Sequence, residues 1–195
     1  MQPIRRLLTL AALAAALTAA STAMAGSPTQ FLESKHNKLD PLLANTSGNE
    51  KKIARIVNQM LDFPTLCKDS LGKHWEERSK AERKEFTETL HALIEKNVIN
   101  RLADTRDHTV SYQSEEITGN RASVVTIVSS GDGPRAQQTE IMYKLRKNGN
   151  KWIVVDMVTD GVSLVSNYRS QFHKIITQDG WATLMQKMKD KLAEQ

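Results

Sequence analysis

The five histidines are the side chains of this sequence best suited to bind a metal ion. They stand at His36, His74, His91, His108 and His173, and no pair has His-x-x-x-His or His-Glu-x-x-His spacing. Those spacings bring two imidazoles to one face of a helix, where zinc enzymes use them. Scattered histidines are typical of surface or packing roles, so we predict no metal site.

The residues that could supply a nucleophile or hold a phosphate stand in unsuitable surroundings. Cys67 and Ser163 belong to no nucleophile motif, and Ser163 precedes an apolar helical pattern that it could cap. Cys67 has no cysteine partner for an internal disulfide and is expected to be a small buried hydrophobe. The Gly131–Pro134 segment lies between two predicted strands, which is typical of a hairpin turn and not of a phosphate loop. We therefore predict no catalytic residue and no cofactor.

Asp156 is the one acid with catalytic potential. The alternating pattern predicts a strand face that it shares with Trp152, Val154 and Val158, and that face should be buried. A desolvated aspartate in a pocket lined by a sheet could act as a general base, as in isomerases with cone-shaped folds. The alternative is a structural carboxylate that accepts hydrogen bonds from a helix start or an arginine, because buried acids are usually paired. We favour the structural role.

Arg169 is the basic side chain with the most suggestive position. It lies beside Tyr168 and Phe172, which stand one helical turn apart on a predicted apolar stripe. A long basic side chain can keep its charge in water while its stem covers apolar surface. We expect Arg169 at the rim of an apolar pocket or in contact with a partner, and the alternative is an exposed ion pair.

Residues 1–25 have the pattern of a cleaved signal peptide. Arg5 and Arg6 precede a run of small apolar residues that ends at Ala20, and the Ala23–Ala25 segment follows as a cleavage site. The run is shorter than the roughly 20 residues that span a bilayer. With no cysteine at the cleavage site to carry a lipid anchor, we expect an exported, soluble protein of a Gram-negative-type periplasm.

The 170 residues that remain, 26–195, suit one domain with or without a helical annex. The full chain has 27 lysines and arginines and 22 acidic residues, and the mature part keeps 25 of the basic ones, a net charge of +3. This balance provides no basic arm of the kind that binds nucleic acid. We expect no nucleic-acid partner.

Helices are predicted on both sides of a central series of strands. The predicted helical segments are 28–61 with a break at 45–49, 62–71, a long segment from Ser79, one from Ser163 and one after Gly180. The long segment has the clearest signature, since Glu82 completes a capping box with Ser79 and Phe86, Leu90 and Leu93 follow at helical spacing.

Between these helices the apolar residues alternate, which is typical of strands. The predicted strands are 108–117, 121–129, 137–147 and 151–159. Gly119-Asn120 and Asn148-Gly149 separate neighbouring strands with residues that tolerate positive φ, so we expect an antiparallel meander. The class is α+β: a curved, four-stranded antiparallel sheet wrapped by N- and C-terminal helices, as in cystatin-like or nuclear-transport-factor-like cones that enclose a deep apolar pocket.

Several segments resemble the toluene-tolerance family, the soluble periplasmic lipid carriers of the Mla phospholipid-transport system. The resemblance rests on Gly161–Leu164, Asn167–Phe172, Leu71–Trp75, Phe86 and the tryptophan-centred strand Trp152–Asp156. Their order and spacing cover essentially the whole mature chain. The resemblance implies a nuclear-transport-factor-like sheet with a helical annex, which holds phospholipid acyl chains inside while the head group faces water. It also implies transfer between an outer-membrane lipoprotein complex and an inner-membrane ABC transporter.

On this interpretation the lipid would meet apolar side chains of the long helix, the sheet and the helix after Ser163. The expected contacts are Leu90, Leu93, Val125, Ile127, Ile141, Tyr143, Val155, Met157, Val162, Leu164, Tyr168 and Phe172, with Arg169 at the rim or in partner docking. A related branch of the family accompanies hopanoid synthesis, so a polycyclic lipid is the alternative cargo. An isomerase-like enzyme that uses Asp156 is the third hypothesis.

Overall fold

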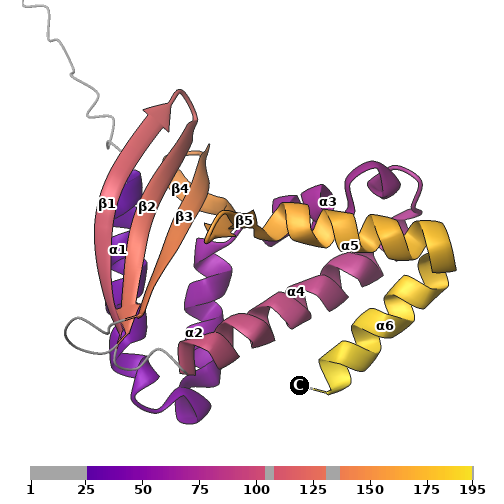
Figure 1. Ribbon diagram of the computed structural model, residues 1–195, viewed down its shortest axis with the longest axis horizontal. Helices are drawn as coiled ribbons and strands as arrows, with labels where there is room; N and C mark the ends of the chain where they lie inside the picture. Colours follow the sequence, from indigo (N-terminus) through magenta and orange to yellow (C-terminus); the bar gives the residue numbers. More distant parts are fainter. Residues whose placement is uncertain (1–25, 104–107, 131–136, 195) are drawn as a thin grey trace, which may run out of the picture.

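The computed structural model describes residues 26–103, 108–130 and 137–194, so the predicted signal peptide lies outside the described residues. A twisted sheet occupies one side of the molecule, and a group of helices extends from it as an annex (Figure 1). Within the described part of the chain, no helix has the length and apolar character required to cross a membrane. The predicted α+β class is confirmed.

The sheet is an open antiparallel meander. Its strands are β1 (His108–Thr118), β2 (Arg121–Ser130), β3 (Gln137–Asn148), β4 (Lys151–Thr159) and β5 (Val162–Ser163), paired in sequence order. Gly119 and Gly149 adopt φ of +61° and +58°, the left-handed conformation that their two hairpin turns require. The prediction of four strands omitted β5, a two-residue strand that the turn at Asp160 and Gly161 folds back onto β4.

The helices lie on both sides of the strands in sequence. They are α1 (Pro28–Leu43), α2 (Thr46–Met60), α3 (Phe63–Leu71), the 3-10 helix η1 (Gly72–Trp75), α4 (Lys80–Ala103), α5 (Leu164–Asp179) and α6 (Trp181–Ala193). Two predicted caps are present. Ser79 and Glu82 exchange hydrogen bonds as a capping box at the start of α4, and Ser163 Oγ accepts from Ser166 N at 3.1 Å.

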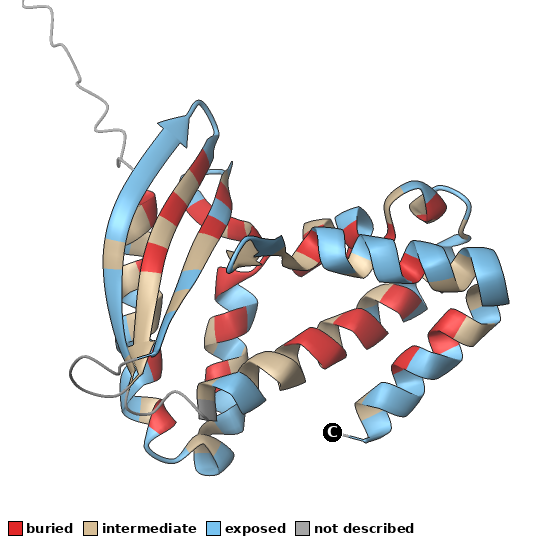
Figure 2. Ribbon diagram, in the orientation of Figure 1, coloured by how far each residue is buried: buried red, intermediate tan, exposed pale blue. Residues whose placement is uncertain are grey.

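One face of the sheet, here called the inner face, packs against α1. It carries the buried Val124, Tyr143 and Val154, and its burial is visible along β2, β3 and β4 (Figure 2). Trp152 at the start of β4 donates from Nε1 to Gly26 O at 3.0 Å, which joins the sheet to the residues before α1. The N-terminal helix therefore covers the sheet that follows it in sequence.

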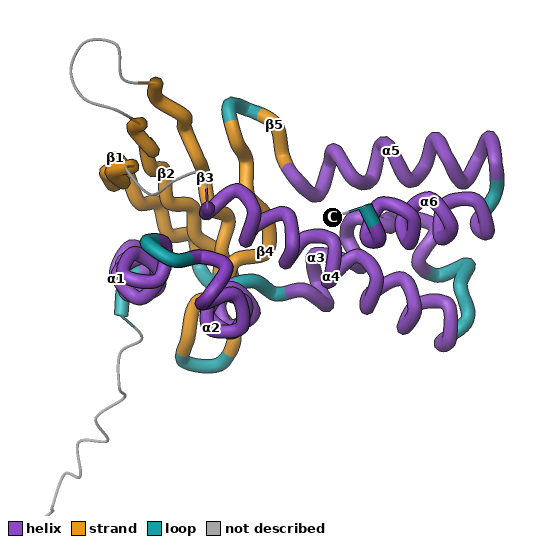
Figure 3. The backbone as a smooth tube through the Cα atoms, turned by 90° about the horizontal axis from the view of Figure 1, so that it is seen from below, coloured by secondary structure: helices purple, strands orange, loops and turns teal. Residues whose placement is uncertain are grey.

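The helical annex consists of α3, η1, α4, α5 and α6. Figure 3 shows these helices on one side of the sheet, with α1 and α2 beneath the strands. Its core includes Phe86, Leu66, Leu71 and Leu184, all almost completely buried. Phe86 meets the ring of Phe172 edge to face at 5.5 Å, so α4 and α5 are joined by aromatic packing.

A β-bulge changes which side chains of β4 face inward. Leu145 pairs with Val154 but the preceding Lys144 pairs with Asp156, so Val155 is the extra residue. The prediction that Asp156 shares a face with Trp152 and Val154 is therefore wrong. An inserted residue reverses the alternation of the strand, and periodicity within one strand does not reveal it.

Candidate functional site

Two adjoining hollows separate the sheet from the helices. The first, the sheet hollow, has a volume of about 380 Å³ and lies between α1, the end of α4 and the inner face. The second, the helix hollow, has a volume of about 350 Å³ and lies between α4, β4 and the start of α5. Both are bounded by Val98, Arg101, Met157 and Thr159, so the two hollows share part of their walls near the end of α4. Each volume lies within the range of small-molecule sites, roughly 300–1,000 Å³.

The wall of the sheet hollow is mainly apolar, and half of the residues around the helix hollow are aliphatic. The aliphatic residues around the sheet hollow are Leu39, Leu43, Val98, Leu102, Val110, Val128, Ile141 and Met157. Those around the helix hollow are Ile94, Val98, Met157, Val162 and Leu164. Hydrocarbon chains gain free energy when they leave water for such surroundings, and this driving force has no directional requirement. The arrangement suits a long apolar ligand.

A polar cluster interrupts the wall of the sheet hollow. His36 of α1 lies between two tyrosines, with its Nδ1 2.6 Å from Tyr112 Oη and its Nε2 3.4 Å from Tyr143 Oη. Burial lowers the pKa of His36, although the carboxylate of Asp40 acts in the opposite direction. Burial also raises the pKa of Tyr112, and it raises that of Tyr143 to about 12. The cluster is therefore uncharged at neutral pH.

The structure places half of the predicted lipid contacts around these hollows. Ile141 and Tyr143 border the sheet hollow, Met157 borders both hollows, and Val162, Leu164 and Tyr168 border the helix hollow. These residues come from β3, β4, β5 and α5. Segments that are distant in sequence thus converge on these two neighbouring hollows.

The other predicted contacts do not line the two hollows. Leu90, Leu93 and Phe172 are buried in the helical core, where Phe172 stacks on Tyr168 at 5.3 Å and meets Phe86. Helical periodicity identified these three residues as buried but did not distinguish a packed core from the wall of a hollow.

Three strand residues lie away from the inner face. The β2–β3 register pairs Val124 with Tyr143 on the inner face and Val125 with Met142, so Val125 and Ile127 project from the opposite face. Val155, the extra residue of the bulge, borders a separate hollow beside α3. The strand register therefore places these three residues outside the two hollows.

The contribution of α1 to the sheet hollow was missed in the sequence. His36, Leu39 and Leu43 all border the hollow, and their i, i+3, i+7 spacing is a helical stripe that could have identified this face. Val98 and Arg101 of α4 were also missed, because they lie beyond the strongest part of its apolar pattern. Val98 and Arg101 nevertheless border both hollows.

Asp156 has the contacts of a structural carboxylate. Its Oδ1 accepts from Val165 N at 3.1 Å, and its Oδ2 accepts from Ser163 Oγ at 2.7 Å and from Lys144 Nζ at 3.1 Å. The side chain is almost completely buried and borders neither hollow. The favoured interpretation from the sequence, a carboxylate that holds a helix start, agrees with this geometry, except that the basic partner is a lysine.

Arg169 is exposed on α5 and borders neither hollow. Its Nε donates to Asp69 O at 2.8 Å, and its stem lies against Gly72. A Cβ at Gly72 would approach Arg169 Cδ to 3.2 Å, and the φ of +57° at Gly72 already favours glycine. Arg169 therefore connects α5 to the end of α3 and does not lie at the rim of either hollow.

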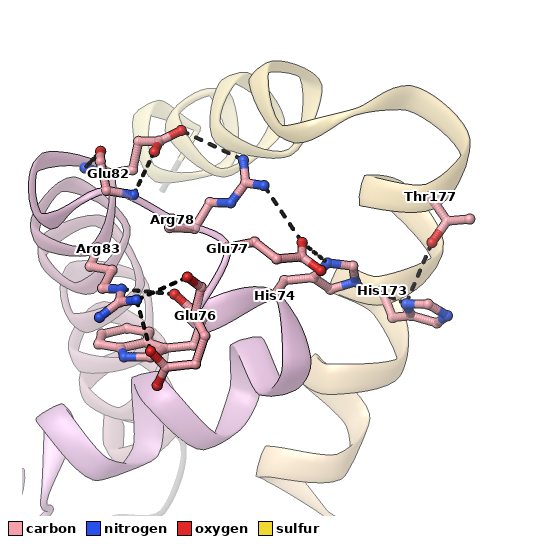
Figure 4. Close-up of polar contacts among 10 residues, drawn as sticks. His74, Glu76, Glu77, Arg78, Glu82, Arg83, His173 and Thr177 are labelled. Atoms are coloured by element: carbon pink, nitrogen blue, oxygen red, sulfur yellow. Dashed lines mark hydrogen bonds and ion pairs between the residues drawn. The ribbon is translucent and has the colours of Figure 1, made fainter.

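A second histidine cluster joins η1 to α5 (Figure 4). His74 Nδ1 lies 2.8 Å from Glu77 Oε2, and His74 Nε2 lies 3.0 Å from His173 Nδ1. The hydrogen bond with His74 lowers the pKa of Glu77, and Arg78 pairs with the same carboxylate at 3.5 Å. Across the described ranges, no group of three or more His, Cys, Asp or Glu side chains could hold a metal ion. We interpret this cluster as a structural contact that holds η1 against α5 within the helical annex.

The sequence and the fold are both similar to those of known proteins. Residues 29–190 match the family described as MlaC protein. The chain is 25% identical over 169 residues to the intermembrane phospholipid transport system binding protein MlaC of Haemophilus influenzae, covering 80% of this chain and 78% of that protein. The fold matches the phospholipid-binding protein of Ralstonia solanacearum, solved in complex with a phospholipid, with a TM-score of 0.74. That match has 19% identity and covers 86% of this chain and 98% of the other. Because the family match spans most of the sequence, the chain belongs to the MlaC protein family.

Proposed function

We propose that this protein is a lipid carrier that holds the acyl chains of a phospholipid in the sheet hollow and the helix hollow. The observation that carries the proposal is that two neighbouring hollows with apolar side chains share the wall residues Val98, Arg101, Met157 and Thr159. The relatives are consistent with it, because one is named as a phospholipid transport binding protein and another was solved with a phospholipid.

The energetics of burial support retention of the cargo during an aqueous crossing. Each methylene that leaves water contributes about 0.8 kcal/mol, so one long acyl chain contributes on the order of 10 kcal/mol. Spontaneous escape of such a ligand would be slow. Release is therefore expected to depend on contact with a partner.

The compartment and partners follow from the resemblance and from the predicted signal peptide. We infer a periplasmic protein with a signal peptide at residues 1–25. Residues 26–195 would form a single lipid-binding domain. The partners would be an outer-membrane lipoprotein complex and an inner-membrane ABC transporter, with maintenance of outer-membrane lipid asymmetry as the cellular role. Arg169, exposed on α5, is a candidate for partner docking.

We further infer that the protein is not an enzyme. Asp156, the acid with catalytic potential, is occupied by three hydrogen-bond donors and borders neither hollow. The relatives are named as binding and transport proteins. No contact of the described residues favours a hopanoid over a phospholipid, so a phospholipid is the cargo we propose.

Native mass spectrometry provides the direct test. The protein should be isolated from a periplasm without detergent or refolding, and its organic extract analysed in parallel. We expect a complex with one or more phospholipids. A bare polypeptide in every preparation would contradict the carrier function, and a bound polycyclic lipid would replace the phospholipid as cargo.

A further inference from the structure

The polar cluster at the sheet hollow combines three elements. His36 belongs to α1, Tyr112 to β1 and Tyr143 to β3, and the two hydroxyls approach the two ring nitrogens of one imidazole. The ring centroids of the tyrosines lie 5.9 and 5.8 Å from that of His36. His36 and Tyr143 border the hollow.

A count of protons shows that this cluster contains one more hydrogen-bond donor than its two contacts use. A neutral imidazole has one N–H and one acceptor nitrogen, and each tyrosine has one O–H. The two contacts use two of these three protons, whichever tautomer the imidazole adopts. One hydroxyl proton is left without an acceptor in the cluster, and neither hydroxyl has another hydrogen bond among the described residues.

The geometry identifies the hydroxyl that keeps this proton. The best pairing in the cluster joins a phenol O–H to an imidazole nitrogen, and the 2.6 Å contact of Tyr112 with Nδ1 has the short distance of such a bond. The imidazole N–H then lies on Nε2 and is directed to Tyr143 Oη across the longer distance of 3.4 Å. Tyr143 keeps a free O–H, and Tyr143 is the tyrosine of the two that borders the hollow.

A buried hydroxyl without an acceptor is unfavourable, because it has lost its hydrogen bonds to water. Tyr143 has only 6% of its surface exposed, so bulk water does not readily supply the acceptor. The acceptor has to come from what fills the hollow. A neutral acceptor is sufficient, because the cluster itself carries no charge. The charged side chains of Asp40 and Arg101, which have opposite signs, both border the hollow.

We propose that Tyr143 Oη donates a hydrogen bond to the ester carbonyl oxygen of an acyl chain of the bound lipid. This proposal rests on the proposed lipid-carrier function and adds a polar subsite to it. The subsite selects ester-linked chains over ether-linked chains, because an alkyl ether lacks the carbonyl oxygen. His36 and Tyr112 act as positioning residues that orient the hydroxyl.

The test is a competition between two lipids that differ in this one group. Delipidated protein is incubated with vesicles of equal parts dimyristoyl phosphatidylglycerol and ditetradecyl phosphatidylglycerol, above both phase transitions. The lipids are then extracted from the reisolated protein and quantified by mass spectrometry. One neutral hydrogen bond predicts enrichment of the ester lipid by roughly five-fold over the ether lipid.

Two variants test whether the Tyr143 hydroxyl is the group that recognises the carbonyl. Tyr143→Phe keeps the ring and removes the hydroxyl, and it should return the bound ratio to that of the vesicles. Thr183→Val is the control, because it also removes a hydroxyl but lies on α6 and borders neither hollow, so it should leave the enrichment unchanged. Thermal melting of each variant establishes that it is folded before the ratio is compared.

Three outcomes would overturn the proposal. Equal loading of both lipids by the parent protein would show that no carbonyl is recognised. Equal loss of enrichment in Tyr143→Phe and in the control Thr183→Val would show that the ratio does not report the hydroxyl at the hollow. An unchanged enrichment in a folded Tyr143→Phe variant would show that the Tyr143 hydroxyl does not recognise the carbonyl. Failure of the parent to load either lipid would instead contradict the carrier function itself.

Discussion

Lys144 and Asp156 face each other across the β3–β4 pair at the bulge, with 3.1 Å between Nζ and Oδ2. The same carboxylate accepts from Ser163 Oγ and from Val165 N, so one side chain links the sheet to the start of α5. The bulge makes this possible, because it turns Asp156 away from the inner face. The position of α5, and with it one wall of the helix hollow, depends on this contact.

We therefore expect Asp156→Asn to lower the stability of the folded protein. The amide oxygen can still accept from Val165 N, but the acceptor of the Ser163 hydroxyl and the charge opposite Lys144 are lost. We expect a loss of about 1–3 kcal/mol in the free energy of unfolding, with little from the half-exposed lysine. Denaturant unfolding measures this loss in the free energy of unfolding. Asp160→Asn in the exposed turn is the control. A stable, loaded Asp156→Asn protein that has lost its cellular role would support catalysis.

Glutamate substitutions at Met157 and Val125 test which of the two sheet faces contacts the lipid. Met157 borders both hollows and Val125 projects from the opposite face. Met157→Glu should reduce lipid loading severely, because an unpaired carboxylate would lie against acyl chains. Val125→Glu should retain lipid. The measurement is phospholipid content per folded protein, and equal loss in both variants would show that the apolar cargo is not held between the sheet and the helices.

A substitution at Phe172 tests whether this residue belongs to the packed core or to the wall of a hollow. Phe172 is 5% exposed and lies between Phe86 and Tyr168. We expect Phe172→Ala to lower the free energy of unfolding by about 3–5 kcal/mol, the usual cost of removing a buried phenylalanine ring. Urea titration checks this. A variant of nearly parental stability that no longer binds lipid would mean that Phe172 contacts the cargo after all.

His36 gives stability a predicted dependence on pH. Burial lowers its pKa in the folded protein below the ordinary histidine value of about 6.5. The unfolded chain therefore takes up a proton first as the pH falls, and stability decreases. The contribution of the neutral imidazole is complete above the unfolded value and is lost as the pH falls through the folded one.

Unfolding free energies measured from neutral to mildly acidic pH would show this decrease. His36→Gln should have a flatter profile over that range, because the titrating group has been removed. A parental profile in His36→Gln would assign the acid sensitivity to other residues.

Much of the secondary structure could be predicted from the sequence because its determinants are local. The capping box of Ser79 and Glu82, the cap at Ser163 and the turn at Gly119 each involve residues within a few positions of one another. Alternation and helical periodicity then identified which segments are strands and which are helices. Family-specific segments such as Asn167–Phe172 led to the correct family.

The tertiary structure decided which apolar residues surround a hollow. Phe172 and Tyr168 lie one turn apart on the same helix, yet the first is packed in the core and the second borders the helix hollow. Phe172 is buried and Tyr168 is partly buried. Both positions favour the same residue types, and periodicity reports only that a side chain is turned away from bulk solvent. The distinction depends on what α4 and β4 place opposite each residue, which is a property of segments distant in sequence.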